Sequence, residues 1–481
     1  MRRFASNYAF ALLANLAQRM STVVLGVWVS RRLGVDALGV FFLAASFTLI
    51  AGRLSYWGLD QLLSREVAKA PERAAQFLGN FIAIRATMAV LTVGLLSLVV
   101  DWLGYAPATA SVILLLALTI VPDNVASICQ AMYIAREEMG YLAFSSGVYG
   151  LGNVVAGGLA LESGWGLEGL AVSLLAVSLL TLCINLGLVW WRYTRPLRSI
   201  DLAFCRQQLR IAFPFIFVSI FYILDNRADV VLLSRLGTER QVGFYGSANT
   251  LVGALTLLPF AYGTSILPVM SRLYVEAPAV LERLYARSFK YLFLLGLPIA
   301  VGITLIAQPL LQLIFGSGFE PAGPILQVVI WSVALLFLNV LNSRIMVVAD
   351  RQDVIARFLA GTLVTNLVLN VALIPSLGAV GSAIARVVST SLLFVLSFMF
   401  VRRELISFNA SSYLPRPIVA SVVMAGTVLA VWSLPLPIVI PLGGAVYLLT
   451  LAALGTFSQE DLTALREMIR PSAPQMSKPA N

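Results

Sequence analysis

The chain has 481 residues, of which 59% are hydrophobic and only 12% are charged. Soluble globular proteins carry about 25% charged residues, so this composition excludes a soluble enzyme, a nucleic-acid-binding protein and a secreted disulfide scaffold. Histidine is absent, which excludes a histidine zinc site, a Ser-His triad and a histidine proton relay. We therefore expect an all-α, polytopic membrane protein.

Apolar runs long enough to cross a bilayer follow one another along almost the whole chain. The first run contains Asn15, Gln18 and Arg19 and has no small-residue cleavage site, so it is predicted to be an uncleaved span and not a signal peptide. No connection is long enough for a catalytic domain. The runs predict about 14 transmembrane helices, at residues 8–30, 37–59, 78–100, 110–133, 142–161, 169–190, 211–234, 243–267, 289–315, 324–348, 354–375, 379–401, 415–434 and 438–457.

The net charge of +10 is explained by where the basic residues lie. With a cytoplasmic N-terminus, six of the 33 Lys and Arg residues fall within spans, and 23 lie in the inner connections or at the span ends that border them. This positive-inside pattern predicts that both termini are cytoplasmic and removes the need for a nucleic-acid partner. Only four basic residues fall on the outer connections: Arg31, Arg32, Arg235 and Arg240.

A short motif occurs twice, after the first predicted span and after the seventh. SRRLGVDALGVFF at 30–42 matches LSRLGTERQVGFY at 233–245, in the order Arg-Leu-Gly, an acidic residue, glycine and an aromatic residue. Six spans separate the copies, and an even number returns the chain to the same side of the membrane, so the repeats are parallel. They predict two six-helix lobes, 1–200 and 201–401, around a central cavity, with 402–481 as an appended helix pair and cytoplasmic tail.

Polar residues within the spans are candidates for the cavity lining, because charged groups at bilayer depth are costly and mark function. In the first span, Asn15, Gln18 and Arg19 share one helix face, and Arg19 lies near the middle. Such a stripe faces either an aqueous lumen or another helix, to which it would form hydrogen bonds. Arg53 lies nearer the cytoplasmic end of the second span, where its side chain could either meet the substrate or snorkel to the interface. Arg85 lies near an inner end, where its side chain is expected to snorkel to the interface.

The second half has its own embedded charges. Asp225 and Asp229 are four residues apart and share a helix face, whereas Arg227 points elsewhere. The two carboxylates could bind a coupling ion or balance arginines across the lumen, and the sequence favours charge balance. With Arg386 added, embedded arginines outnumber embedded acids, so the lumen is predicted to attract anions, and guanidinium groups suit phosphate.

Three widely spaced cysteines are the remaining candidates for metal or redox chemistry. They form no CxxC pair and are expected to be packing residues, so no metal and no cofactor are predicted. These residues are Cys129, Cys183 and Cys205.

Four segments resemble a known family: SRRLGVDALGVFF, VGFYGSANTLVGALTLLPFAYGTSILPVMSRLY, LIFGSGFEPAGPILQVVIW and NLVLNVALIPSLGAVGSAIA. Together they look like the polysaccharide-transport branch of the multidrug/oligosaccharidyl-lipid/polysaccharide exporter superfamily, the Wzx-type flippases. The resemblance extends over about residues 8–401. It implies a flippase that moves an undecaprenyl-diphosphate-linked oligosaccharide from the inner to the outer leaflet of a bacterial cytoplasmic membrane. It also implies that Arg19 and Arg53 meet the diphosphate.

The expected partners are therefore the lipid-linked oligosaccharide, membrane lipids and other membrane proteins of polysaccharide assembly. Two alternatives remain. A membrane-embedded polysaccharide polymerase or ligase would normally carry a large polar outer loop, and every outer connection here is short. A cation-coupled multidrug exporter of the same superfamily is disfavoured by Arg19, because such a pump would carry an acid there. We expect a transporter without enzymatic activity.

Overall fold

The computed structural model describes residues 2–193 and 200–456. Within them, the side chains of residues 2–17, 19, 211–222 and 225 are not described. The described residues are overwhelmingly helical and contain no strand, which confirms the all-α prediction. Among these residues, 12 helices are long and apolar enough to cross a membrane.

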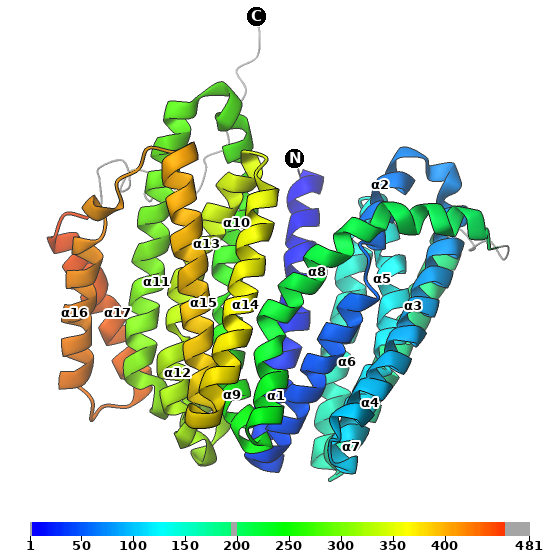
Figure 1. Ribbon diagram of the computed structural model, residues 1–481, viewed down its shortest axis with the longest axis horizontal. Coiled ribbons are helices and arrows are strands. Elements are labelled where there is room, and N and C mark those ends of the chain that lie inside the picture. The colour runs from blue at the N-terminus through cyan, green and yellow to red at the C-terminus, as the bar shows by residue number, and fades with distance from the viewer. Residues whose placement is uncertain (1, 194–199, 457–481) are drawn as a thin grey trace, which may run out of the picture.

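The first half of the chain supplies the helices on the right of Figure 1, coloured blue to cyan. These helices are α1 (Arg2–Leu54), α2 (Leu59–Lys69), α3 (Ala74–Leu103), α4 (Pro107–Ala117), α5 (Ile120–Ala135), α6 (Met139–Glu162) and α7 (Gly166–Arg192), with a 3-10 turn at Pro71–Arg73.

The second half supplies the green to red helices, most of which stand to the left in the same view. They are α8 (Leu202–Leu236), α9 (Glu239–Leu255), α10 (Leu257–Glu276), α11 (Pro278–Phe315), α12 (Gly323–Val329), α13 (Trp331–Val348), α14 (Gln352–Leu377), α15 (Ala379–Phe400), α16 (Pro415–Ala430) and α17 (Leu436–Ala453), with 3-10 turns at Ser317–Ala322 and Ala410–Ser412 and a π-turn at Val401–Leu405.

Helix α1 is two helical arms joined at Gly34. Gly34 has φ 87° and ψ −169°, a conformation open to glycine because it has no Cβ. The arms 2–33 and 35–54 run in opposite directions, and the turn between them lies at the lower edge of Figure 1. Gly34 belongs to the first copy of the repeated motif, so the motif's Arg-Leu-Gly marks the point where the chain turns back.

Several elements differ from the sequence-based expectation. Helix α8 begins at Leu202 and α11 at Pro278, where spans were predicted from residues 211 and 289. The early turns of α8 carry Arg206 and Arg210, which lower the local hydropathy although the residues are helical. Helix α2 lies in a connection for which no helix was predicted. It is amphipathic and buries Leu59, Leu62, Leu63 and Val67.

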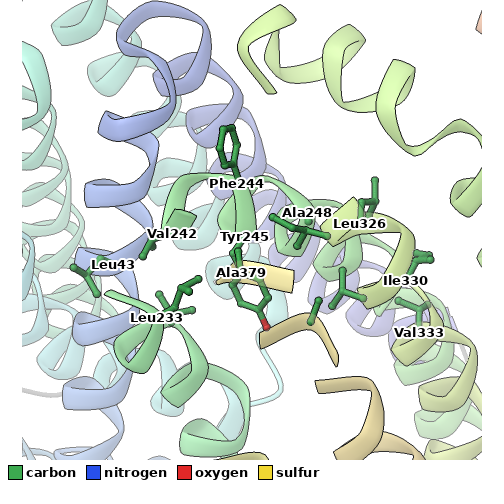
Figure 2. Close-up of a cluster of buried hydrophobic side chains, with 14 of the residues drawn as sticks. Leu43, Leu233, Val242, Phe244, Tyr245, Ala248, Leu326, Ile330, Val333 and Ala379 are labelled. Carbon is green, nitrogen blue, oxygen red and sulfur yellow. The ribbon is translucent and has the colours of Figure 1, made fainter. Parts of the chain in front are cut away.

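Helix α9 lies at the centre of the main apolar core (Figure 2). Its residues Val242, Tyr245 and Ala248 are completely buried. They pack among residues of five other helices: Leu43 of α1, Leu233 of α8, Leu326 of α12, Val333 of α13 and Ala379 of α15. The second copy of the motif, at the start of α9, is therefore a packing centre for both halves of the chain.

The last two helices stand apart from this core, at the left edge of Figure 1. They form a separate apolar cluster with α11, built on Met424, Val428 and Leu451. The Tyr447 hydroxyl donates a hydrogen bond of 2.8 Å to the Leu294 carbonyl of α11. The pair is thus attached to the outside of the second half.

Candidate functional site

The two copies of the repeated motif pack directly against each other. A Cβ built on Gly39 of α1 would lie only 2.0 Å from the Glu239 carbonyl oxygen of α9. A Cβ on Gly243 of α9 would lie 2.2 Å from the Val35 carbonyl oxygen of α1. The two backbones can approach this closely only because both positions are glycine. We call this the repeat contact, formed by Val35, Gly39 and Phe42 of α1 with Glu239, Gly243 and Gly246 of α9.

Phe42 completes the repeat contact one helical turn further along α1. A Cβ on Gly246 would lie 2.8 Å from the ring of Phe42, so the ring fills the space that glycine leaves. The Arg227 guanidinium of α8 lies 5.1 Å from the centre of the same ring, within the range of a cation–π interaction. Arg227, predicted to line a lumen, therefore contacts the opposite half of the chain through an aromatic side chain.

Polar contacts join the halves at the same end of the bundle. The Thr109 hydroxyl of α4 donates a 2.5 Å hydrogen bond to the Glu239 carboxylate. Tyr105 and Ser234 share a hydrogen bond of 2.7 Å, and the Arg235 guanidinium lies 5.2 Å from the centre of the Tyr105 ring. Glu239 and Arg235 both belong to the second motif, so the motif makes the backbone contact and also the polar contacts around it.

The first motif makes a similar contact with α11. The Arg31 side chain donates hydrogen bonds to the carbonyl oxygens of Leu313 and Ile314, at 2.5 and 2.9 Å. These carbonyls lie in the last turn of α11, which ends at Phe315, where cations are favoured by the helix dipole. One end of the bundle is thus closed by interlocking glycines, two arginines and three hydroxyl groups.

A buried charge network lies deeper in the second half. The Asp229 carboxylate of α8 is 1% exposed and lies 3.6 Å from the Arg386 guanidinium of α15, which is 13% exposed. It also accepts a hydrogen bond from the Tyr245 hydroxyl and one of 2.9 Å from the Val230 backbone N–H. A carboxylate held by one cation and two donors is largely satisfied within the protein.

A second cluster joins the end of α1 to α2, α3 and α5. Arg85 of α3 is fully buried. It donates hydrogen bonds to the Ser55 carbonyl at 2.9 Å and to Asn124 Oδ1 at 2.8 Å, and it pairs with the Asp60 carboxylate. The expectation that Arg85 snorkels to the interface is therefore wrong. The side chain satisfies its charge inside the bundle because Asp60 and Asn124, distant in sequence, fold onto it.

The Arg53 side chain is exposed, unlike the described side chains of Arg85, Arg227 and Arg386. Its guanidinium lies 5.1 Å from the centre of the Tyr56 ring. No carboxylate among the described side chains forms an ion pair with it. Burial and the nearby Asp60 carboxylate raise the pKa of Tyr56 to about 12, so the ring stays neutral at physiological pH. Arg53 thus carries a positive charge that an anion could reach.

The remaining predicted site residues are only partly covered by the structure. Gln18 lies on α1 with an exposed side chain. Asn15 and Arg19 lie on the same helix and Asp225 lies on α8, but their side chains fall outside the described residues. The proposed lumenal stripe of the first span therefore stays a prediction.

The described residues offer no group of three or more Cys, Asp or Glu side chains that could hold a metal ion. All three cysteines are free, with Cys129 and Cys205 buried and Cys183 exposed. The available chemistry is that of arginine, carboxylate and hydroxyl groups, located at the contact between the halves and in one buried cluster within each half.

Comparison with known sequences identifies the family of this chain. Residues 4–274, which include both copies of the motif, match the family described as polysaccharide biosynthesis protein. The chain belongs to this family. Residues 214–372 also match the MatE family. Both findings support the polysaccharide-flippase branch of the exporter superfamily, as the sequence segments predicted.

Relatives of this family member carry flippase names. It is 25% identical to the probable low-salt glycan biosynthesis flippase Agl15 of Haloferax volcanii, over 82% of this chain and 83% of the relative. It is 23% identical to the probable flippase AglR of the same organism, over 82% of each chain. The similarity spans more than four fifths of both relatives, so it is not confined to the repeated motif.

Solved structures share the fold. The lipid II flippase MurJ in an inward closed conformation is 15% identical, with a TM-score of 0.75, and the similarity covers 96% of this chain and all of that one. An inward-facing multidrug resistance MATE family transporter is 14% identical, with a TM-score of 0.63, over 82% of this chain and 97% of that one. The MurJ match is the more extensive of these two, because it covers 96% of this chain and the MATE match covers 82%.

Several residues of this polysaccharide biosynthesis protein were not singled out from the sequence. Tyr105, Thr109 and Asn124 each contact a charged group from another helix. Their residue types are common in membrane proteins, and their charged partners lie from 39 to 130 positions away in sequence. No sequence signal marked them, except that Glu239 and Arg235 belong to the repeat.

Proposed function

We propose that this chain flips an undecaprenyl-diphosphate-linked oligosaccharide from the inner to the outer leaflet of a bacterial cytoplasmic membrane. The observation that carries the proposal is the exposed Arg53, whose positive charge is not taken up by a described carboxylate, beside arginines that are neutralised internally. Arg85 is paired with Asp60 and Arg386 with Asp229. An anion entering between the halves would meet Arg53, and a guanidinium binds phosphate oxygens through paired donors.

The proposed topology has 14 crossings with both termini in the cytoplasm. It adds two crossings to the 12 apolar helices by counting the arms of α1 separately and including α8. Residues 1–200 and 201–401 form the two lobes, related by an axis along the membrane normal, and 402–481 hold the appended pair. The repeat contact then lies at the outer surface, and the Arg53 end faces the cytoplasm.

This placement supports transport by alternating access. With the repeat contact closed, substrate enters from the inner leaflet and its diphosphate binds near Arg53 and, by the family resemblance, Arg19. Separation of Gly39 from Gly243 opens the outer end and releases the lipid-linked glycan into the outer leaflet. The glycines suit this role because backbone contact seals the end without a bulky side chain that must be moved aside.

The membrane potential can supply the driving force. A diphosphate carries about two negative charges, and each charge gains about 2.3 kcal/mol per 100 mV when it leaves a negative interior. Outward flipping is then favoured by about 4–5 kcal/mol at 100 mV. We propose that Asp229 balances Arg386 and carries no coupling ion, because the carboxylate is already held by a cation and two hydrogen-bond donors.

The proposal is tested by deleting the gene and identifying the lipid-linked sugar that accumulates. We expect an undecaprenyl-diphosphate oligosaccharide to build up on the cytoplasmic leaflet and to disappear when the wild-type chain is restored. Arg53→Ala should not restore export although it reaches the membrane, whereas the exposed, lipid-facing Leu151→Ala serves as the matched control and should. Normal export with Arg53→Ala would contradict the proposed role of this residue.

The MatE match over residues 214–372 favours one competing function, a cation-coupled exporter of small molecules. Such a pump would need a carboxylate available to an ion, and Asp225 and Asp229 are the candidates in α8. The two functions differ in their energy source. A cation-coupled pump would follow an imposed proton or sodium gradient, whereas the proposed flippase responds to the potential alone.

A further inference from the structure

Tyr56 contacts two guanidinium groups at once. The Arg85 guanidinium lies 4.6 Å from the centre of the Tyr56 ring, and the Arg53 guanidinium lies 5.1 Å from it. Both distances are within the range of cation–π interaction. The ring therefore connects a fully buried arginine to an exposed one, at the point where α1 ends and the chain turns toward α2.

The buried arginine is fixed from three sides. Asp60 of α2 pairs with it, Asn124 of α5 accepts a hydrogen bond from it, and the Ser55 carbonyl at the end of α1 accepts another. Because these partners come from three elements, the Arg85 guanidinium has little freedom. The Tyr56 ring that packs on it is restrained in turn.

The backbone adds to this restraint. After Tyr56, Trp57 and Gly58 both have positive φ, at 45° and 68°. The Trp57 indole donates a hydrogen bond of 2.7 Å to the Leu54 carbonyl and so closes the end of α1. Tyr56 is therefore held by a tight turn and by Arg85.

This cluster contains two arginines, Arg53 and Arg85, but only one carboxylate, Asp60. Asp60 pairs with Arg85, and Asp60 Oδ1 also lies 3.4 Å from the Ser127 hydroxyl that donates to it. One positive charge remains, on Arg53, and its guanidinium packs on the neutral ring of Tyr56 and forms no ion pair with a described carboxylate. A ring contact orients a guanidinium but leaves its N–H donors available for an oxyanion.

We infer that Tyr56 and Arg85 are positioning residues that hold the Arg53 guanidinium ready for the substrate diphosphate. The inference rests on the proposed function, since it assigns the support of the same site. Arg85 fixes the ring, the ring fixes Arg53, and Asp60 keeps the charge of Arg85 from competing for the anion. Positioning of the Arg53 guanidinium requires the aromatic ring of Tyr56 but not its hydroxyl group.

The test measures binding of undecaprenyl diphosphate to the full-length protein in nanodiscs of zwitterionic lipid. Tyr56→Leu, which removes the ring, should weaken binding about two- to fivefold, the factor expected for one exposed cation–π contact. Tyr56→Phe keeps the ring and should bind within twofold of wild type. Arg53→Ala removes a charge-assisted contact and should weaken binding about tenfold or more.

The double variant Arg53→Ala/Tyr56→Leu decides between positioning and independent roles. If the ring acts through Arg53, the double variant binds like Arg53→Ala alone, because the two effects are not additive. If Tyr56→Leu weakens binding equally in both backgrounds, the inference is overturned and the proposed function stands. If Arg53→Ala binds like wild type, the proposed diphosphate site itself is wrong.

Arg85→Lys provides a second line of evidence should Tyr56→Leu unfold the protein. Lysine keeps a cation for Asp60 but lacks the planar fork that bonds Ser55 and Asn124 and packs on the ring. In the protein that retains Arg53, we expect Arg85→Lys to weaken binding of undecaprenyl diphosphate. In the Arg53→Ala variant, adding Arg85→Lys should not weaken binding further. Unchanged binding by folded Arg85→Lys would contradict the positioning role of Arg85.

Discussion

Gly39→Ala tests whether the repeat contact holds one end of the protein closed. The added methyl group would lie 2.0 Å from the Glu239 carbonyl oxygen and 3.0 Å from the Gly243 backbone nitrogen. These neighbours are backbone atoms of α9, whose helix is buried at the centre of the core, so they cannot move aside as a flexible side chain can. The contact must open by an ångström or more to accept the methyl group.

The size of the effect follows from that clash. Overpacking a tightly packed interface costs about 1–3 kcal/mol. If the cost falls on the closed state alone, the closed population drops about 5- to 150-fold relative to the open one. The matched control is Gly94→Ala in α3, because no atom lies within 4 Å of a Cβ built there. That variant should leave the equilibrium unchanged.

Thiol accessibility measures the opening. Val242, completely buried beside the contact, is replaced by cysteine in a chain whose three natural cysteines are changed to alanine. In intact spheroplasts an impermeant maleimide should react slowly with Val242→Cys, several-fold faster when Gly39→Ala is added, and no faster with Gly94→Ala. Equal labelling rates in a stable Gly39→Ala protein would show that the glycine contact does not keep this end closed.

Three further outcomes are expected. Arg19→Ala should abolish glycan export while the protein remains in the membrane, and Arg19→Lys should retain part of the export; normal export of Arg19→Ala, scored on surface glycan, would remove it from the site. Arg386→Met leaves the Asp229 carboxylate buried without its cation and should cost about 3–5 kcal/mol of stability, a loss that Asp229→Asn largely reverses when thermal unfolding is followed in micelles. In the chain without natural cysteines, exposed Ser317→Cys should label in intact spheroplasts and exposed Glu72→Cys only after permeabilisation, and the reverse pattern would invert the topology.

Hydropathy and the repeat predicted much of the architecture. A transmembrane span is marked by an apolar run of bilayer length, which is a property of the local sequence. Most helices therefore lie close to the positions that the sequence predicted. The motif at Arg32 and Arg235 was visible because it recurs in sequence. The structural role of the motif could not be predicted, because the sequence pattern does not indicate that the two copies pack against each other at Gly39 and Gly243.

The site was harder to predict because it depends on long-range pairing. Arg85 was expected at the interface from its position along the span, but Asp60 and Asn124 bring its partners inside the bundle. Conversely, Arg53 was one of several embedded arginines that could bind a diphosphate, and the sequence did not distinguish them by chemistry. Only the fold separates an arginine already paired inside the bundle from one whose charge remains accessible.

We propose that this polysaccharide biosynthesis protein moves a lipid-linked diphosphate glycan across the bilayer under the membrane potential. Flipping of a fluorescent undecaprenyl-diphosphate oligosaccharide can be measured in proteoliposomes, with a valinomycin–potassium potential set at constant pH and sodium. We expect flipping to exceed that of protein-free vesicles, to speed up when the potential favours movement of the anion, and to be lost with Arg53→Ala. Flipping that does not respond to the potential but follows an imposed proton or sodium gradient would show that an ion gradient, and not the potential, drives transport.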